Sequence, residues 1–387
     1  MLAYPQLWEK LHFMQTFQIV PEICMLPTVD DFLKEFAPTK SDLVFASSGT
    51  QKRHLAGKLS GATVIDYRAY GQGEPTDLMV EGIVKALGGK TYDRVFAIGG
   101  GTILDVAKLF ALEKLSPVTD LYQKKFPAKK AHKLILVPTT CGTGSEVTNI
   151  SILELTKLGT KMGLADAALY ADQAVLVPEF LKGLPDRVFG ASAIDALIHS
   201  VESYTSPKST PFSRTFSRRA MDSIIEGFLA IQKDGLPARE AYLEKFLIAS
   251  TYAGVAFGNA GCAAVHALSY PLGAAQHVPH GESNAVMFAA VYEAYKNKRY
   301  DGYLEKLTLH IANLLRTTED EAFPKLMALL DEILPKKPLK GYGVKEADLK
   351  DYTDIVMTKQ GRLMANNYVE LTESDVMGIY QKLYNQA

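Results

Sequence analysis

The first half of the chain alternates short apolar, β-branched runs with stretches that carry the periodicity of amphipathic helices. Helix-like stretches occur at 77–87 and 103–112, and the strand-like runs are 43–46, 62–65, 94–98, 133–137, 150–155 and 174–177. Strands that alternate with helices form βαβ units around a parallel sheet. The pattern therefore predicts an α/β fold with a doubly wound, mostly parallel sheet, which binds ligands outside the carboxyl ends of its strands.

The pattern changes after Pro178. Long helical stretches follow from residue 186 onward with almost no strand signal, for example 213–232, 239–257 and 322–334. The 387 residues also exceed what a single hydrophobic core usually supports. We therefore predict two domains, an α/β domain over 1–182 and an all-helical domain over 183–387.

The charge balance, the cysteines and the lack of long apolar runs limit which kinds of partner this protein is expected to bind. The 42 Lys and Arg nearly balance the 43 Asp and Glu, so no net field favours nucleic acid or an anionic membrane. The three cysteines have no metal-like spacing and are typical of reduced thiols. The N-terminus lacks the pattern of a signal peptide, and no apolar run is long enough to span a bilayer. We expect a cytoplasmic protein that acts on a small molecule, with neither nucleic acid nor membrane as partner.

Two polar, glycine-rich turns follow successive strands. Gly99, Gly100, Gly101 and Thr102 come directly after the strand at 94–98 and open the next helix, whose free N–H groups suit a phosphate. Their spacing is not Gly-x-Gly-x-x-Gly, and such a cluster alone can be an ordinary tight turn.

The second turn, 137–146 (VPTTCGTGSE), supplies hydroxyls from Thr139, Thr140 and Thr143. It lacks the Gly-Lys-Ser/Thr ending of a P-loop. Two such turns in one sheet predict a dinucleotide site.

A metal site is indicated by two groups of polar residues. Asp195 and His199 lie four apart in the helical pattern 191–204, so both project from one face, although such a pair alone is often a helix-surface hydrogen bond. His266, His277 and His280 fall within fifteen residues of apolar and small neighbours.

Breaks at Pro271, Gly273 and Pro279 are expected to place His266 and His280 on separate elements that can converge. Buried imidazoles there could equally be satisfied core residues. A carboxylate with imidazoles suits Fe²⁺ or Zn²⁺.

Together, GGGTILDVAK (99–108), PTTCGTGSEVTN (138–149), SAIDALIHSVESY (192–204) and the 265–281 segment resemble the iron-containing, group III alcohol dehydrogenases in order and spacing. The resemblance covers about 90 to 380. It implies an NAD-binding first domain, a metal-binding and substrate second domain, a cleft between them, and a homo-oligomer. The metal ligands it implies are Asp195, His199, His266 and His280, and the cofactor residues are Gly99, Gly100, Gly101, Thr102, Thr139, Thr140, Thr143 and Lys161.

The segments 177–185, 252–270 and 362–368 are similar to the branch of that family that acts on 4-hydroxybutyrate. This implies hydride transfer between NAD(H) and a primary alcohol, with 4-hydroxybutyrate and succinate semialdehyde as the expected pair. A hydroxy acid also needs a partner for its carboxylate. Arg362, Asn366 and Asn367 are the candidates for that contact.

Two positions depart from the family pattern. Tyr270 stands where many members have a further histidine, so Tyr270 or His277 is expected to relay the proton. The chain has Ala46-Ser47-Ser48 where many members carry an aspartate for the adenosine ribose, so NADP stays possible beside NAD.

Three other functions compete with this one, and two of them are disfavoured. The nearest alternative is another alcohol dehydrogenase of the same family that acts on 1,3-propanediol, lactaldehyde or butanol. A lyase of the dehydroquinate synthase type is disfavoured by the Asp195-led ligand set and the PTTCGTGSE turn. A non-enzymatic nucleotide-binding protein is disfavoured because unmatched buried ligands would cost stability.

Overall fold

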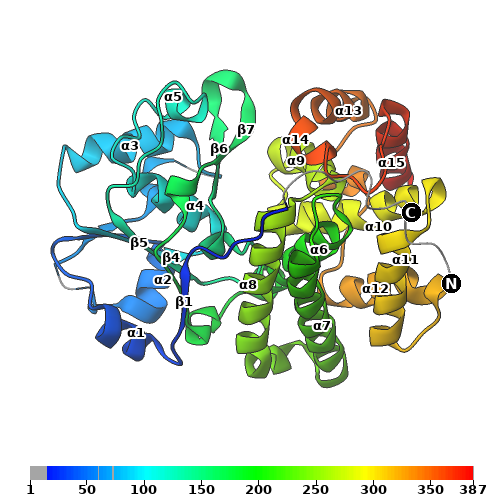
Figure 1. Cartoon of the computed structure of the whole chain (residues 1–387), viewed down its shortest axis with the longest axis horizontal. Helices are drawn as coiled ribbons and strands as arrows, with labels where there is room; N and C mark the ends of the chain where they lie inside the picture. Colours follow the sequence, from blue (N-terminus) through cyan, green and yellow to red (C-terminus); the bar gives the residue numbers. More distant parts are fainter. Residues whose placement is uncertain (1–14, 60, 72–73, 387) are drawn as a thin grey trace.

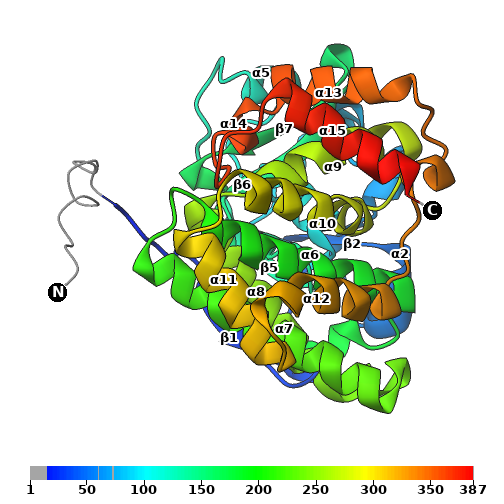
Figure 2. The ribbon, with the colours of Figure 1, turned by 90° about the vertical axis from the view of Figure 1, so that its right-hand side faces the viewer.

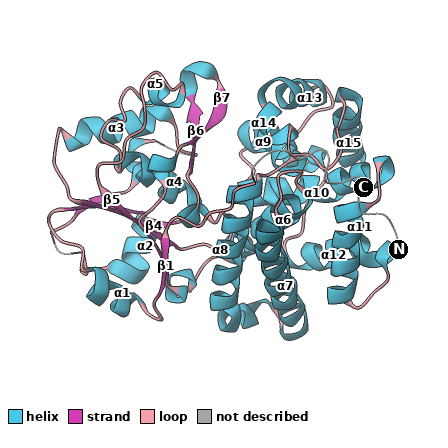
Figure 3. Cartoon of the chain, viewed as in Figure 1, coloured by secondary structure: helices cyan, strands magenta, loops and turns pink. Residues whose placement is uncertain are grey.

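The computed structural model describes residues 15–59, 61–71 and 74–386. Figure 1 shows two parts side by side, one with all the described strands and one built of helices. Figure 3 makes the same division by secondary structure. The boundary expected after residue 182 stays a prediction; it falls between the last strand and helix α6.

Six strands form one sheet in the order β1-β8-β5-β4-β2-β3, and every neighbouring pair is parallel. The strands are β1 (Glu22–Met25), β2 (Asp42–Ala46), β3 (Thr63–Ile65), β4 (Arg94–Gly99), β5 (Lys133–Pro138) and β8 (Gln173–Leu176). The doubly wound, parallel sheet predicted from the alternating pattern is thus confirmed. β1 was not predicted, because its four residues lie at the sheet edge and are mostly exposed.

Alternate residues of the central strands face two hydrophobic layers. Leu43 and Phe45 pack with helices on one face, whereas Val44 and Ala46 pack on the other. The first layer comprises α3 (Asp77–Leu87), α4 (Gly101–Phe110) and α5 (Val118–Tyr122), and the second includes α1 (Val29–Phe36). A one-turn helix, α2 (Ser48–Thr50), follows β2.

The predicted strand 150–155 is present as β6 (Ile150–Leu155), but it lies outside the main sheet. It pairs antiparallel with β7 (Thr160–Ala165), a strand the sequence did not reveal because Lys161 and Gly163 interrupt its apolar pattern. The resulting hairpin lies on the side of the strand-containing part that faces the helical part (Figures 1 and 3).

The second part of the chain is helical and has one continuous hydrophobic core. Its helices are α6 (Asp186–Thr205), α7 (Pro211–Asp234), α8 (Leu243–Ala260), α9 (Ala264–Gln276), α10 (His280–Lys298), α11 (Gly302–Leu315), α12 (Glu319–Ile333), α13 (Asp348–Lys359), α14 (Gly361–Met364) and α15 (Glu373–Asn385). Figure 2 shows α6 enclosed among its neighbours. The prediction of an all-helical second half is confirmed.

One local expectation about α9 was wrong. Pro271 and Gly273 do not end this helix, which continues to Gln276. Burial of Val265, Leu268 and Leu272 stabilises it past the proline, whose own effect is local. The break between His266 and His280 is the 277–279 turn, so the two histidines do lie on separate helices.

Among the described residues, no single helix is long and apolar enough to cross a membrane. One pair of neighbouring helical segments, Leu236–Ala260 and Ala264–Gln276, has the required length and composition together but is bent by 107°.

The strand order also locates a crevice for a ligand. From β2 the chain moves outward to β3 and then returns to β4 on the other side of β2. The turns after β2 and β4 therefore diverge at their carboxyl ends, and doubly wound sheets bind ligands at such a switch point.

Candidate active site

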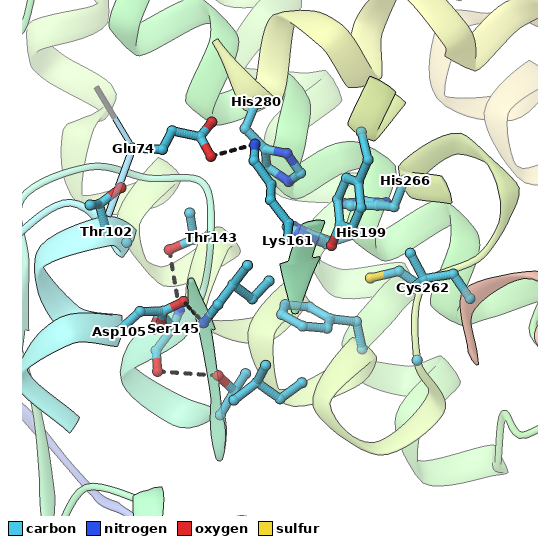
Figure 4. A pocket seen from close by; sticks show the side chains of 18 of the residues that line it. Glu74, Thr102, Asp105, Thr143, Ser145, Lys161, His199, Cys262, His266 and His280 are labelled. Atoms are coloured by element: carbon cyan, nitrogen blue, oxygen red, sulfur yellow. Dashed lines mark hydrogen bonds and ion pairs between the residues drawn. The ribbon is translucent and has the colours of Figure 1, made fainter. Parts of the chain in front are cut away.

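A cavity of about 180 Å³ lies where the glycine turns and the β6–β7 hairpin face helices α6, α9 and α10. Figure 4 shows Thr102 and Thr143 on one side of it and three imidazoles on the other. Apolar side chains also line the cavity, among them Ile150, Ile152, Phe257 and Leu363. The cavity is therefore bounded by residues from both parts of the chain.

Four side chains that could hold a metal ion converge at this cavity. Asp195 and His199 come from α6, His266 from α9 and His280 from the first position of α10. Their ligand atoms all lie within 4.8 Å of one another. Asp195 Oδ1 is 3.7 Å from His266 Nε2 and 3.8 Å from His280 Nε2, and Asp195 Oδ2 is 3.9 Å from His199 Nδ1. Donors about 2.1 Å from a shared ion would have similar separations.

Unpaired nitrogens test whether this cluster fits a metal. His199 Nδ1 and His266 Nε2 are buried and have no hydrogen-bond partner in the described part of the chain. A buried polar atom without a partner is unfavourable by about 1–3 kcal/mol. A divalent cation at the centre would engage both nitrogens, and three imidazoles with one carboxylate suit Fe²⁺ or Zn²⁺. The residues present therefore fit a divalent metal.

A carboxylate behind the cluster holds His266 in place. Glu202 Oε2 lies 2.6 Å from His266 Nδ1, and Glu202 also accepts hydrogen bonds from the backbone N–H groups of Ala263 (3.0 Å) and Val265 (2.7 Å). Histidine ligands commonly donate their second N–H to such a carboxylate, which leaves the other nitrogen for the metal. Glu202 was not predicted from the sequence. Its position seven residues after Asp195, on the same helix face, was the available signal.

The pKa values of His199 and His266 are shifted in opposite directions. Burial lowers the pKa of His199 to about 3, so this ring is neutral near pH 7 and can offer its lone pair. Burial also acts to lower the pKa of His266, but Glu202 and Asp195 outweigh it and raise the pKa to about 9. A metal that binds at His266 therefore displaces a proton.

The two glycine turns contact each other beside the cluster. The backbone N–H of Thr139 donates to Gly99 O at 3.0 Å. A Cβ on Gly101 would lie 2.5 Å from Thr143 Cγ2, so only glycine fits this approach. Gly100 precedes α4 as its N-cap. The free N–H groups at this helix end can bind a phosphate.

The predicted cofactor residues divide into two groups. Four of them line the cavity, namely Gly101, Thr102, Thr143 and Lys161. The other four are not among the lining residues but belong to the same two turns, and they are Gly99, Gly100, Thr139 and Thr140. Lys161 on β7 forms an ion pair with Glu74, which the sequence did not single out (Figure 4).

The two candidates for proton relay are placed differently. Tyr270 lines the cavity, and its ring centroid lies 6.1 Å from that of His280. Burial raises the pKa of Tyr270, so its phenol can donate a hydrogen bond but is a poor base. His277 is exposed at the end of α9, outside the cavity lining, and its position gives the predicted relay no support. The role of Tyr270 stays a prediction.

A carboxylate that the sequence did not reveal lies at the turn after β2. Asp66 directly follows β3, and its Oδ2 accepts a hydrogen bond of 2.6 Å from the backbone N–H of Ser48. The turn that lacks its own aspartate therefore has one from the neighbouring strand. This acidic group lies beside the switch point of the sheet.

Comparisons of the sequence identify relatives over nearly the whole chain. Residues 24–178 match the family model for iron-containing alcohol dehydrogenase, and residues 189–384 match that for the C-terminal part of the Fe-containing alcohol dehydrogenase family. The chain is 42% identical over 371 residues to a 4-hydroxybutyrate dehydrogenase of Clostridium kluyveri, covering 96% of this chain and 100% of the relative. It is 34% identical over 311 residues to long-chain-alcohol dehydrogenase 1 of Geobacillus thermodenitrificans, covering 76% and 75%.

Solved structures share the fold. A sulfoacetaldehyde reductase from Bifidobacterium kashiwanohense in complex with NAD⁺ matches with a TM-score of 0.81 and 23% identity, covering 97% of this chain and 100% of that one. A 1,3-propanediol oxidoreductase matches with a TM-score of 0.81 and 22% identity, covering 96% and 100%. The sequence matches and the fold agree, and the chain therefore belongs to the iron-containing alcohol dehydrogenase family of oxidoreductases.

Proposed function

We propose that this protein is an NAD-dependent dehydrogenase that interconverts 4-hydroxybutyrate and succinate semialdehyde. The observation that carries this proposal is the 42% identity to a 4-hydroxybutyrate dehydrogenase along that enzyme's full length. In the oxidation, the carbinol carbon gives a hydride to the nicotinamide and the hydroxyl gives a proton to solvent. The carboxylate is unchanged.

We propose that Asp195, His199, His266 and His280 hold Fe²⁺. The family assignment, the unpaired imidazole nitrogens and the Glu202 contact support this set. When bound, such an ion is a Lewis acid that lowers the pKa of the substrate hydroxyl, and the nicotinamide is the hydride acceptor. The protein's own part is to fix the imidazoles through α6, α9 and α10 and to surround the reacting carbon with apolar side chains.

We propose that NAD crosses the switch point between β2 and β4, with its pyrophosphate at Gly99, Gly100, Gly101 and Thr102. Thr139, Thr140 and Thr143 provide hydroxyls from the second turn, and Lys161 a positive charge from β7. The contact between the two turns and their shared cavity support this course. The NAD⁺ complex of the Bifidobacterium reductase is a further parallel.

Absorbance of NADH under anaerobic conditions, with iron added, tests the proposed reaction. We expect 4-hydroxybutyrate to be oxidised with a higher kcat/KM than 1-butanol, 1,3-propanediol or 1,2-propanediol, the alcohol that corresponds to lactaldehyde. A higher kcat/KM for any of these three would show that the substrate is misassigned within the family. No NADH from any alcohol would contradict the dehydrogenase itself.

The protein should prefer NAD to NADP. The carboxylate of Asp66 would repel a 2′-phosphate at the turn after β2. We expect Asp66→Asn, which removes the charge but keeps a carbonyl acceptor, to raise the NADP/NAD ratio of kcat/KM by about tenfold.

Asp93→Ala is the control, because Asp93 is exposed at the amino end of β4, away from the crevice. An unchanged ratio in Asp66→Asn would remove Asp66 from cofactor selection.

We propose that the protein works as a homo-oligomer in the cytoplasm. β1 is an edge strand of the sheet, and exposed apolar side chains cluster on it and just before it, at Ile19, Val20, Ile23 and Met25. Unpaired strand edges with apolar side chains favour association with another chain. Light scattering after size exclusion should give at least twice the monomer mass of 42.4 kDa, and a monomer would contradict the proposal.

A further inference from the structure

Two cationic side chains, Lys161 and Arg362, line the cavity besides the imidazoles. They differ in whether the described structure gives them an anionic partner. Lys161 is paired with Glu74. Arg362 forms neither an ion pair nor a side-chain hydrogen bond within residues 15–59, 61–71 and 74–386. A guanidinium that faces a cavity with its donors free is suited to a carboxylate, which it can bind through two parallel hydrogen bonds.

The guanidinium reaches across the cavity to the β6–β7 hairpin. Arg362 Nη2 lies 3.6 Å from the position of a Cβ on Gly163, and Ile150 and Ile152 lie within 3.8 Å of the same point. Both isoleucines line the cavity. A Cβ at Gly163 would make ordinary van der Waals contact with the guanidinium, which therefore lies against the hairpin beside the two isoleucines.

The backbone of Arg362 is tied to the segment that carries His266. Asn366, which is 2% exposed, donates from Nδ2 to Cys262 O at 2.9 Å and to Arg362 O at 3.4 Å. Cys262 lies four residues before His266, so the arginine and the metal-ligand cluster are held in a fixed relation. Asn366 is thus a positioning residue, and it does not line the cavity itself.

Charge effects inside the cavity agree with this placement. Burial raises the pKa of Tyr270, and the positive charge of Arg362 acts against that rise. The same charge acts on the buried thiol of Cys262. Both residues line the cavity together with His280. The field of Arg362 therefore reaches the space beside the metal-ligand cluster.

We propose that Arg362 binds the carboxylate of the substrate and so selects hydroxy acids over uncharged alcohols. The inference rests on the proposed function for the identity of the acid. The hydroxyl end lies at the four-residue cluster, the methylene chain packs on Ile150 and Ile152, and the carboxylate pairs with the guanidinium. Arg362 lines the cavity and is exposed, so its guanidinium can hold the carboxylate by two parallel hydrogen bonds where the cavity meets solvent.

Steady-state kinetics of the iron-loaded enzyme test this assignment with 4-hydroxybutyrate and with 1,4-butanediol, which replaces the carboxylate by an uncharged group. We expect Arg362→Gln to lower kcat/KM for 4-hydroxybutyrate roughly 10- to 100-fold, mainly through KM, and to leave 1,4-butanediol unaffected. Arg362→Lys should recover part of the loss because it keeps the charge without the planar fork.

Arg316→Gln is the matched control, since Arg316 is exposed at the end of α11 and outside the cavity. An equal loss with both substrates in Arg362→Gln would overturn the proposal and assign the arginine a structural role. An unchanged KM for 4-hydroxybutyrate would overturn it as well.

Butyrate provides a readout that does not depend on turnover of a hydroxy acid. Calorimetry should show butyrate binding to the wild-type holoenzyme with roughly 10- to 100-fold higher affinity than to Arg362→Gln. If the wild type oxidises 1,4-butanediol but not 4-hydroxybutyrate, the proposed function fails, whereas the butyrate difference still tests Arg362. Equal butyrate affinity in both proteins would overturn the role of the arginine whatever the substrate.

Discussion

Replacing His266 with alanine will remove most of the bound iron and lower kcat/KM by at least about 10³-fold. The substitution deletes one of the four proposed donors and leaves the buried Glu202 without its imidazole partner. A Lewis acid contributes several kcal/mol to such a reaction, and about 1.4 kcal/mol corresponds to a tenfold change in rate. Metal analysis of protein loaded with Fe²⁺ without oxygen, together with NADH kinetics, measures both effects.

Loss of folding is the competing explanation for this result, because a buried carboxylate without a partner destabilises a protein. His280→Ala separates the two, since the His280 side chain is 35% exposed and does not contact Glu202. We expect it to lose iron and activity while it keeps the wild-type circular dichroism spectrum. His132→Ala, in the other part of the chain, should change neither. Full iron content and activity in either cluster variant would remove these residues from the metal site.

Gly281→Ala should have the next largest effect, although it adds only a methyl group. A Cβ at this position would overlap the backbone carbonyl of Ala191 and approach Asp195 Cβ at 3.1 Å. Helix α10 would have to move away from α6, and His280 would move with it. We expect a loss of about 1–3 kcal/mol in the free energy of unfolding and a roughly 10- to 100-fold weaker affinity for Fe²⁺.

Gly378→Ala is the matched control for this substitution, because nothing lies within 4 Å of a Cβ added there in α15. It should stabilise the protein by about 0.5–1 kcal/mol, as expected for alanine in a helix. Urea denaturation and metal titration of both variants give the comparison. Wild-type iron affinity in Gly281→Ala would show that the two helices can part without disturbing the cluster.

The sequence predicted the elements whose signal is local. The predicted ends of β2, β4 and β5 agree with the structure to within one residue. These strands are buried on both faces, so each is a continuous apolar run in the sequence. Both predicted ends of helix α3 agree with the structure, because Thr76 is its N-cap and Gly88 follows it in the left-handed conformation. β1 and β7 were missed, since an exposed edge strand and a two-stranded hairpin depend on pairing rather than on a pattern of their own.

The site residues likewise divide into those with a local sequence signal and those placed by tertiary packing. The four-residue spacing of Asp195 and His199 is a local signal, but the approach of α9 and α10 to α6 comes from tertiary packing and needed the family resemblance. Glu74 pairs with a residue distant in sequence, so nothing in its neighbourhood revealed it. Glu202 also contacts a distant residue, His266, and its only local signal was its place on the same face of α6 as Asp195. Asp66 was missed because it follows β3, whereas the family pattern directed attention to the residues after β2.

The walls of the cavity come from the two different parts of the chain, so mutations in one wall can be made independently of mutations in the other. The turns expected to bind the cofactor come from the strand-containing part, whereas Arg362 and the ligand cluster come from the helical part. Within the residues that the structure describes, Asp66 and Arg362 share no hydrogen-bond partner. The free-energy effects of distant residues that share no partner usually add. A double variant should therefore combine the two changes in preference as the product of the single ones, which makes cofactor choice and substrate choice separately adjustable.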